Sequence, residues 1–253
     1  MGKVIALANQ KGGVGKTTST IELATNLTML GKKVLVIDFD QQGDTTRSVN
    51  GDGNFKNIYQ VINIDVPIAE SIQHLEYFDL ICSSKQLNKV DKTFTDRDDI
   101  YLLDEVLKPI KDSYDFILTD NNPDLGMLFT MSIVAADFVI IPTECDDNAI
   151  NGLRETENVI EKLKNGRNHE THAEILGYIL TKREDTNMYA LAHEDIEKIA
   201  SSKENKPFVM SISKGVKIAE AKTLRVPVSF EQKSSKQARE YYAIAQEIVT
   251  RTA

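Results

Sequence analysis

The sequence predicts an α/β protein with a mainly parallel, twisted sheet that carries helices on both faces. Short apolar runs alternate with longer stretches of helical period, which is typical of strand–helix–strand units. A glycine-rich loop follows the first apolar run, and aspartates follow two later ones. Because ligands of parallel sheets bind beyond the carboxyl ends of the strands, these observations place a ligand site at one edge of the sheet.

The composition suits one sizeable globular domain. The chain has 253 residues, of which 41% are hydrophobic and 27% are charged. It has no apolar run of about 18 residues and no N-terminal apolar leader with a cleavage site, so we expect a cytoplasmic protein without a membrane span. Cys82 and Cys145 lie far apart without metal-type spacing, and we expect them to be packing residues. We therefore expect one domain over residues 1–253.

The elements follow from hydrophobic periodicity. In the first helix, Ile21, Ala24 and Leu27 recur on one face, and Gly31 stands at the C-cap position. Short runs rich in Val, Ile, Leu and Phe predict strands at residues 3–9, 33–39, 78–82, 114–120, 137–142 and 174–181. Stretches of helical period predict helices at about 16–30, 100–111, 126–135, 149–164, 188–202, 216–222 and 235–250.

The loop between the first strand and the first helix has the residues that bind phosphate. Its glycines permit the backbone to curl so that several N–H groups converge on phosphate oxygens, and the following helix adds the positive end of its dipole. Lys16 is expected to reach the β- and γ-phosphates, and Thr17 is expected to offer its hydroxyl to Mg²⁺. The predicted nucleotide-binding residues are Lys11, Gly12, Gly13, Val14, Gly15, Lys16, Thr17 and Thr18.

This loop departs from the common pattern G-x-x-x-x-G-K-[ST], because Gln10 replaces the first glycine and a lysine, Lys11, follows it. Here the chain resembles the ParA/MinD family of deviant Walker A P-loop NTPases, whose pattern is K-G-G-x-G-K-[ST]. The resemblance implies that Lys11 reaches across an ATP-bound homodimer to the phosphates of the other subunit. It also implies slow, partner-stimulated hydrolysis of ATP to ADP and phosphate.

The strand at 33–39 leads into two aspartates, Asp38 and Asp40, whose side chains share one face because they are two residues apart. The segment is similar to the family's D-x-D-P-Q-G-N, with Gln41 in place of Pro and Asp44 in place of Asn. The resemblance implies that Asp40 orients the attacking water. Asp38 is expected to support the loop and the metal shell.

The strand at 114–120 ends at Asp120, which stands where a Walker B aspartate holds Mg²⁺. The segment is similar to the family's D-T-P-P-S-L-G, with Asn121 and Asn122 in place of Thr and Pro. The expected magnesium set is Thr17, Asp38 and Asp120. The expected catalytic set is Lys11, Lys16 and Asp40.

Two interpretations of the base-binding segment compete. Thr181-Lys182-Arg183-Glu184 approaches the GTPase motif [NT]-K-x-D, but with the longer Glu, whereas residues 184–187, E-D-T-N, resemble a ParA segment. The rest of the chain favours the second interpretation, and hence ATP. The stretch at 216–221 resembles the family's V-x-x-x-E-A segment near the base pocket.

Basic residues gather in the C-terminal third. Residues 201–240 contain nine Lys or Arg and four Glu, a local charge of +5, although the whole chain carries −8. The resemblance implies that an ATP dimer binds nucleoid DNA through phosphate contacts without sequence preference, until a ParB-type centromere-binding protein stimulates hydrolysis. The candidate DNA contacts are Lys214, Lys217, Lys222, Arg225, Lys233, Lys236 and Arg239. No N-terminal helix-turn-helix domain is expected.

A MinD-like positioning ATPase, acting at a membrane or on non-DNA cargo, is the main alternative. It needs a basic amphipathic C-terminal helix, whereas residues 240–249 are acidic to neutral and have the pattern of a packing helix. An electron carrier related to nitrogenase reductase needs paired cluster-binding cysteines, which Cys82 and Cys145 do not provide. A related synthetase or kinase needs a substrate pocket, for which the sequence shows no motif. The predicted function is therefore ATP-dependent DNA segregation.

Overall fold

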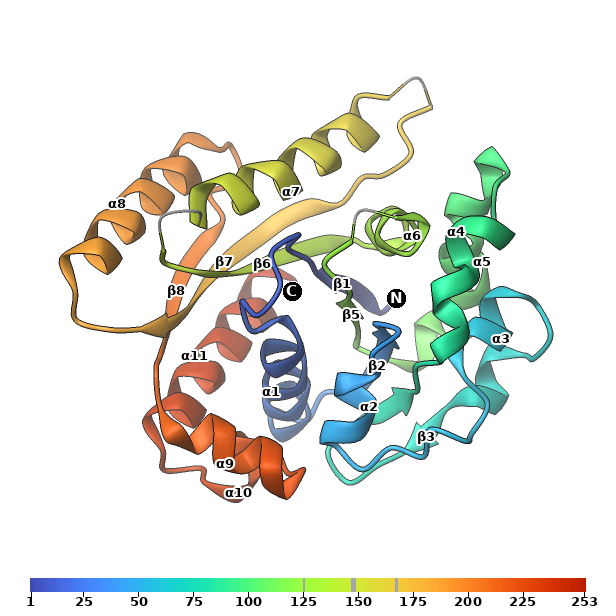
Figure 1. Ribbon diagram of the computed structural model, residues 1–253, viewed down its shortest axis with the longest axis horizontal. Helices are drawn as coiled ribbons and strands as arrows, with labels where there is room; N and C mark the ends of the chain where they lie inside the picture. Colours follow the sequence, from blue (N-terminus) through green and yellow to red (C-terminus); the bar gives the residue numbers. More distant parts are fainter. Residues whose placement is uncertain (125, 147–148, 167) are drawn as a thin grey trace.

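A computed structural model describes residues 1–124, 126–146, 149–166 and 168–253 (Figure 1). Its strands are β1 (Lys3–Leu7), β2 (Val34–Phe39), β3 (Gln73–His74), β4 (Asp79–Ile81), β5 (Phe116–Asn121), β6 (Phe138–Glu144), β7 (Glu174–Arg183) and β8 (Phe208–Ser213). Its α-helices are α1 (Lys16–Met29), α2 (Asp44–Ser48), α3 (Ile58–Ile62), α4 (Val90–Thr93), α5 (Leu102–Leu107), α6 (Met127–Ala135), α7 (Ala149–Lys164), α8 (Asn187–Ser202), α9 (Val216–Leu224), α10 (Val228–Glu231) and α11 (Lys236–Arg251). Short 3₁₀ helices lie at η1 (Ile68–Ser71), η2 (Lys85–Lys89), η3 (Arg97–Tyr101) and η4 (Lys111–Ser113).

The strands form one sheet in the order β3-β4-β2-β5-β1-β6-β7-β8. Every neighbouring pair is parallel except the edge pair β3 and β4. The predicted fold class is confirmed: the sheet is mainly parallel and has helices on both faces. β1 lies in the interior of the sheet between β5 and β6, so the loop that follows β1 opens at the middle of the sheet edge.

Side chains alternate between the two faces of the sheet, as the pleat of a strand requires. On β1, Val4 and Ala6 belong to the apolar cluster that includes residues of α3, α5, α6, α7 and α8, whereas Ile5 and Leu7 belong to the cluster that includes residues of α1 and α11. Figure 1 shows α7 and α8 above the sheet, and α1 and α11 below it. Each face therefore has its own apolar core.

The first helix begins and ends at glycines. Gly15, its N-cap, has a φ of 88°, and Gly31, just beyond its C-cap, has a φ of 79°. Such left-handed conformations favour glycine, and they confirm the predicted bounds to within one residue. Among the described residues, no helix combines the length and the apolarity needed to cross a bilayer.

The six predicted strands and seven predicted helices are present, and one of the helices is shorter than predicted. The helix expected at 100–111 is only α5, between the 3₁₀ helices η3 and η4. Further elements were not predicted: the edge strands β3 and β8, and the short helices α2, α3, α4 and α10. Each of these is brief or lies at an edge, so its hydrophobic period covers too few residues to be recognised.

Candidate functional site

The loop after β1 curls around the ammonium group of Lys16. Gly13 and Gly15 have φ angles of 77° and 88°, which turn the loop into the first turn of α1. Lys16 Nζ donates to the carbonyl of Asn9 at 2.8 Å and to that of Lys11 at 3.1 Å. Burial lowers the pKa of Lys16, while the charges of Asp120 and Asp40 act in the opposite direction. The lysine is thus held inside the loop, where a phosphate group would contact it.

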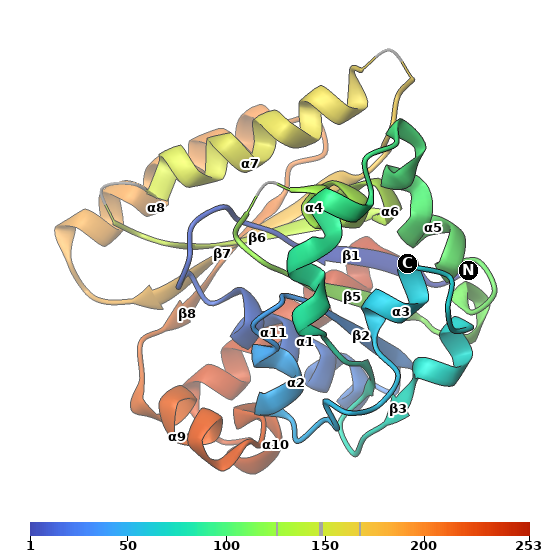
Figure 2. The same ribbon diagram turned by 45° about the vertical axis from the view of Figure 1, so that its right-hand side comes forward.

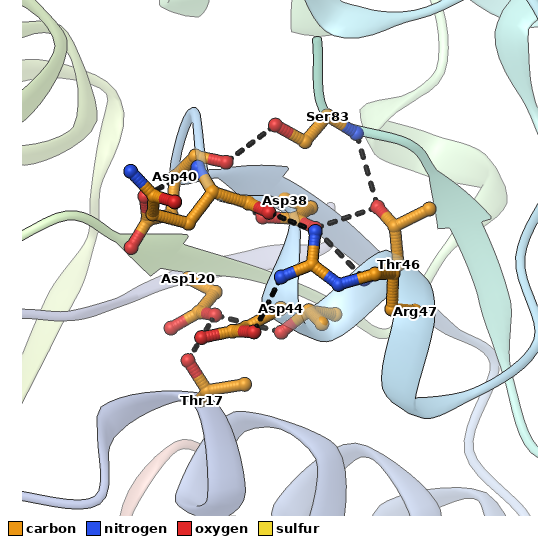
Figure 3. Close-up of polar contacts among 10 residues, drawn as sticks. Thr17, Asp38, Asp40, Asp44, Thr46, Arg47, Ser83 and Asp120 are labelled. Atoms are coloured by element: carbon orange, nitrogen blue, oxygen red, sulfur yellow. Dashed lines mark hydrogen bonds and ion pairs between the residues drawn. The ribbon is translucent and has the colours of Figure 1, made fainter. Parts of the chain in front are cut away.

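Two aspartates lie abreast at the carboxyl end of the sheet. Asp38 on β2 is the register partner of Asp120 on β5, and both are buried. Thr17 Oγ1 donates to Asp120 Oδ2 at 2.8 Å, which joins α1 to β5. The structure therefore brings together Thr17, Asp38 and Asp120, the expected magnesium set (Figure 3).

Burial of this pair raises both pKa values. The pKa of Asp38 rises to about 8, because burial and the neighbouring charge of Asp120 disfavour its ionised form. The pKa of Asp120 rises to about 6 through burial, although hydrogen bonds from Thr45 and Thr17 act against the rise. Two adjacent carboxylates ionise together more readily when a cation lies beside them.

The donor set fits Mg²⁺. It consists of carboxylate and hydroxyl oxygens, which this ion prefers, and no cluster of three or more His, Cys, Asp or Glu suited to a metal occurs in the described part of the chain. Mg²⁺ is usually held by one or two carboxylates together with substrate phosphates. Asp38 uses both carboxylate oxygens within the protein, since Oδ2 accepts from Thr46 and Oδ1 lies 3.3 Å from the amide of Asp40. Asp120 likewise accepts on both oxygens, on Oδ2 from Thr17 and Thr45 and on Oδ1 from Thr20 at 3.4 Å.

Asp40 begins the turn that follows β2 and is half-buried. Its carboxylate accepts from the amide of Gln42 at 2.8 Å, and its carbonyl accepts from the amide of Gly43 at 2.8 Å and from the hydroxyl of Ser83. Asp44, in contrast, forms a surface ion pair with Arg47. The turn therefore presents Asp40 at the same edge of the sheet as Lys16, and the carboxylate of Asp44 is engaged by Arg47.

Lys11 contacts its own chain. Its ammonium group forms an ion pair with Asp146, which follows β6, and its amide donates to Asn9 Oδ1 at 2.9 Å. The side chain remains 28% exposed, at the rim of the loop. A contact with a second subunit is therefore compatible with its position and stays a prediction.

A mainly apolar cavity of about 340 Å³ adjoins the glycine loop. Its lining comes from the loop, the end of β7, the end of β8 and α9: Gly15, Thr18, Thr181, Lys182, Ile212, Ser213, Lys214, Gly215, Ile218, Ala219, Lys222 and Tyr241. Glu184 does not line it; its carboxylate accepts from Lys214 at 2.8 Å. The acid that a guanine-specific motif requires is thus engaged by Lys214 outside this cavity.

The wall of this cavity depends on residues that the sequence did not single out. Gln237 on α11 donates to the carbonyl of Ser213 at 3.2 Å, and Glu240 accepts from the amide of Ser213 at 2.7 Å. Arg183 completes the network by donating to Glu240 at 2.9 Å. No local motif marks Gln237 or Glu240, because the chain brings the members of this network together from three separate elements.

The seven candidate DNA contacts lie on α9, at the start of α11 and in the segments that flank α9 and α10, at one end of the molecule (Figure 1). Lys214 and Lys217 form ion pairs with Glu184 and Glu220. The other five are exposed: Lys222, Arg225, Lys233, Lys236 and Arg239. This end of the molecule therefore presents positive charge that acidic side chains balance only in part.

Comparison with known proteins gives three findings. A family model described as an AAA domain matches residues 2–173. The chromosome-partitioning ATPase Soj of Treponema pallidum is 34% identical over 99% of this chain and 98% of its own length. A Borrelia burgdorferi structure described as a plasmid partition protein bound to AMPPNP has a TM-score of 0.83 at 25% identity, and the match covers 99% of both chains.

A third kind of protein shares the fold. The structure of cobyrinic acid a,c-diamide synthase from Mycobacterium smegmatis, with bound ADP and magnesium, has a TM-score of 0.80 at 24% identity. The match covers 98% of this chain and 94% of that one. At this identity the likeness concerns the fold alone.

Proposed function

Because the chain belongs to the ParA/Soj family of partition ATPases, we propose that it hydrolyses ATP with Mg²⁺ to control its binding to DNA. One domain over residues 1–253 would carry the activity in the nucleoid-containing cytoplasm. The observation that carries the proposal is the meeting of Lys16, Thr17 and Asp120 at the carboxyl end of the sheet, where the Thr17 hydroxyl lies 2.8 Å from Asp120. A phosphate-binding lysine, a metal-binding hydroxyl and an acidic partner are the parts that phosphoryl transfer to water requires.

Each residue has a distinct role in this proposal. The backbone of residues 11–18 and the ammonium group of Lys16 bind the triphosphate, and the apolar cavity beside α9 takes the adenine. Thr17 and Asp120 would hold Mg²⁺, with Asp38 behind them, and the ion would neutralise charge that develops on the phosphates. Asp40 accepts a hydrogen bond from the attacking water and orients it.

The dimer depends on Lys11. We propose that its ammonium group leaves Asp146 and contacts the phosphates bound by the second subunit, so that ATP joins the two subunits. Its exposure at the rim of the loop supports this role. Hydrolysis would then weaken the dimer, because the contacted phosphate departs.

DNA binding is assigned to the basic end of the molecule. The five exposed cations there suit phosphate contacts, which fall steeply with salt and show little dependence on sequence. A ParB-type centromere-binding protein would stimulate hydrolysis and release the dimer.

The MinD-like alternative is disfavoured by the packing of α11. Its apolar residues Tyr241, Ile244, Ala245 and Ile248 are buried against the sheet and α1, so this helix has no free apolar face for a bilayer. Sedimentation with anionic liposomes in the presence of ATP tests the alternative directly. Co-sedimentation that requires ATP would favour a membrane role over DNA partition.

The decisive experiment compares Asp40→Ala with the parent protein in ATP, ADP and no nucleotide. We expect the variant to form a dimer with ATP, to retain non-specific DNA and to turn over poorly, as seen by size exclusion, DNA retention and phosphate release. Asp44→Ala is the matched control, because Asp44 lies in the same segment and its carboxylate pairs with Arg47. Hydrolysis by Asp40→Ala at the parental rate would remove its assigned role.

A companion variant tests the dimer. We expect Lys11→Ala to bind ATP as a monomer and to lose DNA retention. ATP-dependent dimers of normal stability in this variant would exclude the contact between subunits.

A further inference from the structure

Two adjacent threonines on α2 contact the two buried aspartates of the site. Thr45 Oγ1 donates to Asp120 Oδ2 at 2.7 Å. Thr46 donates to Asp38 Oδ2 twice, from its hydroxyl at 2.6 Å and from its amide at 2.8 Å. Both threonines are buried. Both hydroxyls donate to strand residues and not to carbonyl groups of their own helix, so they join α2 to the sheet.

This arrangement depends on the register of the sheet. Asp38 and Asp120 are partners on the neighbouring parallel strands β2 and β5. Successive residues of a helix point in different directions, so Thr45 and Thr46 reach the two strands separately. Thr17 and Thr45 donate to the same oxygen, Asp120 Oδ2, at 2.8 and 2.7 Å. The glycine loop, α2 and β5 therefore meet at one carboxylate atom.

The same helix is attached to the turn that carries Asp40. Gly43, with a φ of 65°, is the N-cap of α2, and its amide donates to the carbonyl of Asp40. The hydroxyl of Ser83 also donates to that carbonyl, while the Ser83 amide donates to Thr46 Oγ1 at 3.1 Å. Figure 3 shows Asp38, Thr46, Ser83 and Asp40 as one continuous hydrogen-bonded set. A shift of α2 would therefore move Asp40.

We propose that Thr45 is a positioning residue for hydrolysis, which holds the Asp40 turn at a fixed place relative to Asp120. This inference rests on the proposed ATPase function. Thr46 fixes α2 to Asp38 on β2, and Thr45 supplies the attachment to β5. Without Thr45, α2 loses its link to β5 and keeps its links to Asp38 and Ser83 through Thr46, so it can shift relative to Asp120. The contacts of Lys16 with the triphosphate should be retained, because the hydroxyl of Thr45 bonds to Asp120, whereas Lys16 bonds to the carbonyls of Asn9 and Lys11.

The test uses Thr45→Val, which keeps the shape and removes the hydroxyl, and Thr45→Ser, which keeps the hydroxyl. Loss of one hydrogen bond to a charged group predicts that kcat falls about tenfold in the valine variant. The KM for ATP and the Kd of a non-hydrolysable analogue should stay within about twofold. Amide hydrogen exchange over residues 41–48 should become faster in Thr45→Val, and Thr45→Ser should restore both properties.

Thr25→Val is the matched control. Thr25 is a buried threonine of α1 whose hydroxyl donates to the carbonyl of Ile21 in its own helix. The Thr25→Val substitution should leave kcat and the amide exchange of residues 41–48 unchanged. Three results would each overturn the proposal. They are a parental kcat in Thr45→Val, a change in KM that exceeds the change in kcat, and a Thr45→Ser protein that does not recover the parental kcat and amide exchange.

Two further arms keep the test decisive. If Thr45→Val does not fold by circular dichroism, Thr45→Ala is measured against Thr45→Ser with the same expectations. If the parent protein does not hydrolyse ATP even with DNA, the proposed function fails, but the exchange arm still decides the role of Thr45. Unchanged exchange over residues 41–48 would then refute it.

Discussion

Glu22, in the middle of α1, provides the most direct test of how the C-terminal segment is attached to this helix. Its carboxylate is 3% exposed and accepts from the amides of Val228 and Ser229 at 2.7 and 2.9 Å, where α10 begins. Asn26, one turn later on α1, donates to the hydroxyl of Ser229 at 2.7 Å. Burial raises the pKa of Glu22, and the bonds from Ser229 and Val228 oppose that rise.

We expect Glu22→Ala to lower the free energy of unfolding by about 3 kcal/mol. Two buried amides lose their acceptor, at about 1–3 kcal/mol each, and release of the buried carboxylate offsets part of that loss. For a chain of this size the melting temperature should fall by roughly 6–12 °C. The free energy of unfolding of Glu22→Gln should lie between those of the parent and Glu22→Ala. One side-chain oxygen remains in Glu22→Gln as an acceptor, but the –NH₂ group faces the second donor.

Thermal unfolding followed by circular dichroism, with urea unfolding to confirm an unchanged m-value, measures the effect. Glu155→Ala on α7 is the control, because Glu155 is exposed and its loss should cost no more than about 0.5 kcal/mol. If Glu22→Ala melts within a degree or two of that control, the carboxylate does not hold α10 in place.

Three further predictions follow from the same structure. Lys16→Ala should weaken ATP binding by at least about 100-fold, since a cation on the phosphates is lost, and parental affinity in calorimetry would contradict the loop assignment. Asp38→Asn should flatten the pH dependence of stability: the raised pKa of Asp38, about 8, means that its favourable contribution is complete below its unfolded pKa and is lost as pH rises through about 8. Equal losses of stability in parent and variant between about pH 6 and 9, measured without nucleotide, would refute this. Gly177→Ala should cost about 1–3 kcal/mol, because the added methyl group overlaps the ring of Phe208 on β8; an unchanged urea midpoint would count against that packing.

The sequence predicted the elements whose period extends over several turns or over a buried strand. The phosphate loop was also predictable, because its glycines, Lys16 and Thr17 are consecutive and act through local backbone geometry. Membership of the ParA/Soj family confirms the resemblance drawn from that loop.

Other parts of the site were not predictable, because they depend on register and packing. That Asp38 lies directly beside Asp120 follows from the pairing of β2 with β5, which residue spacing does not specify. Thr45 lies in a five-residue polar helix with no hydrophobic period. The bond from Val228 to Glu22 joins positions 206 residues apart, and no local pattern marks either of them.

The interior place of β1 has a consequence for how the protein is made. β1 leaves the ribosome before β5 and β6, with which it pairs and which begin at Phe116 and Phe138. Until β5 has been synthesised, this apolar strand has neither of the strands with which it pairs, and contacts so distant in sequence form slowly. The phosphate loop, which hangs from the end of β1, therefore acquires its shape late, so a truncated nascent chain should not bind nucleotide.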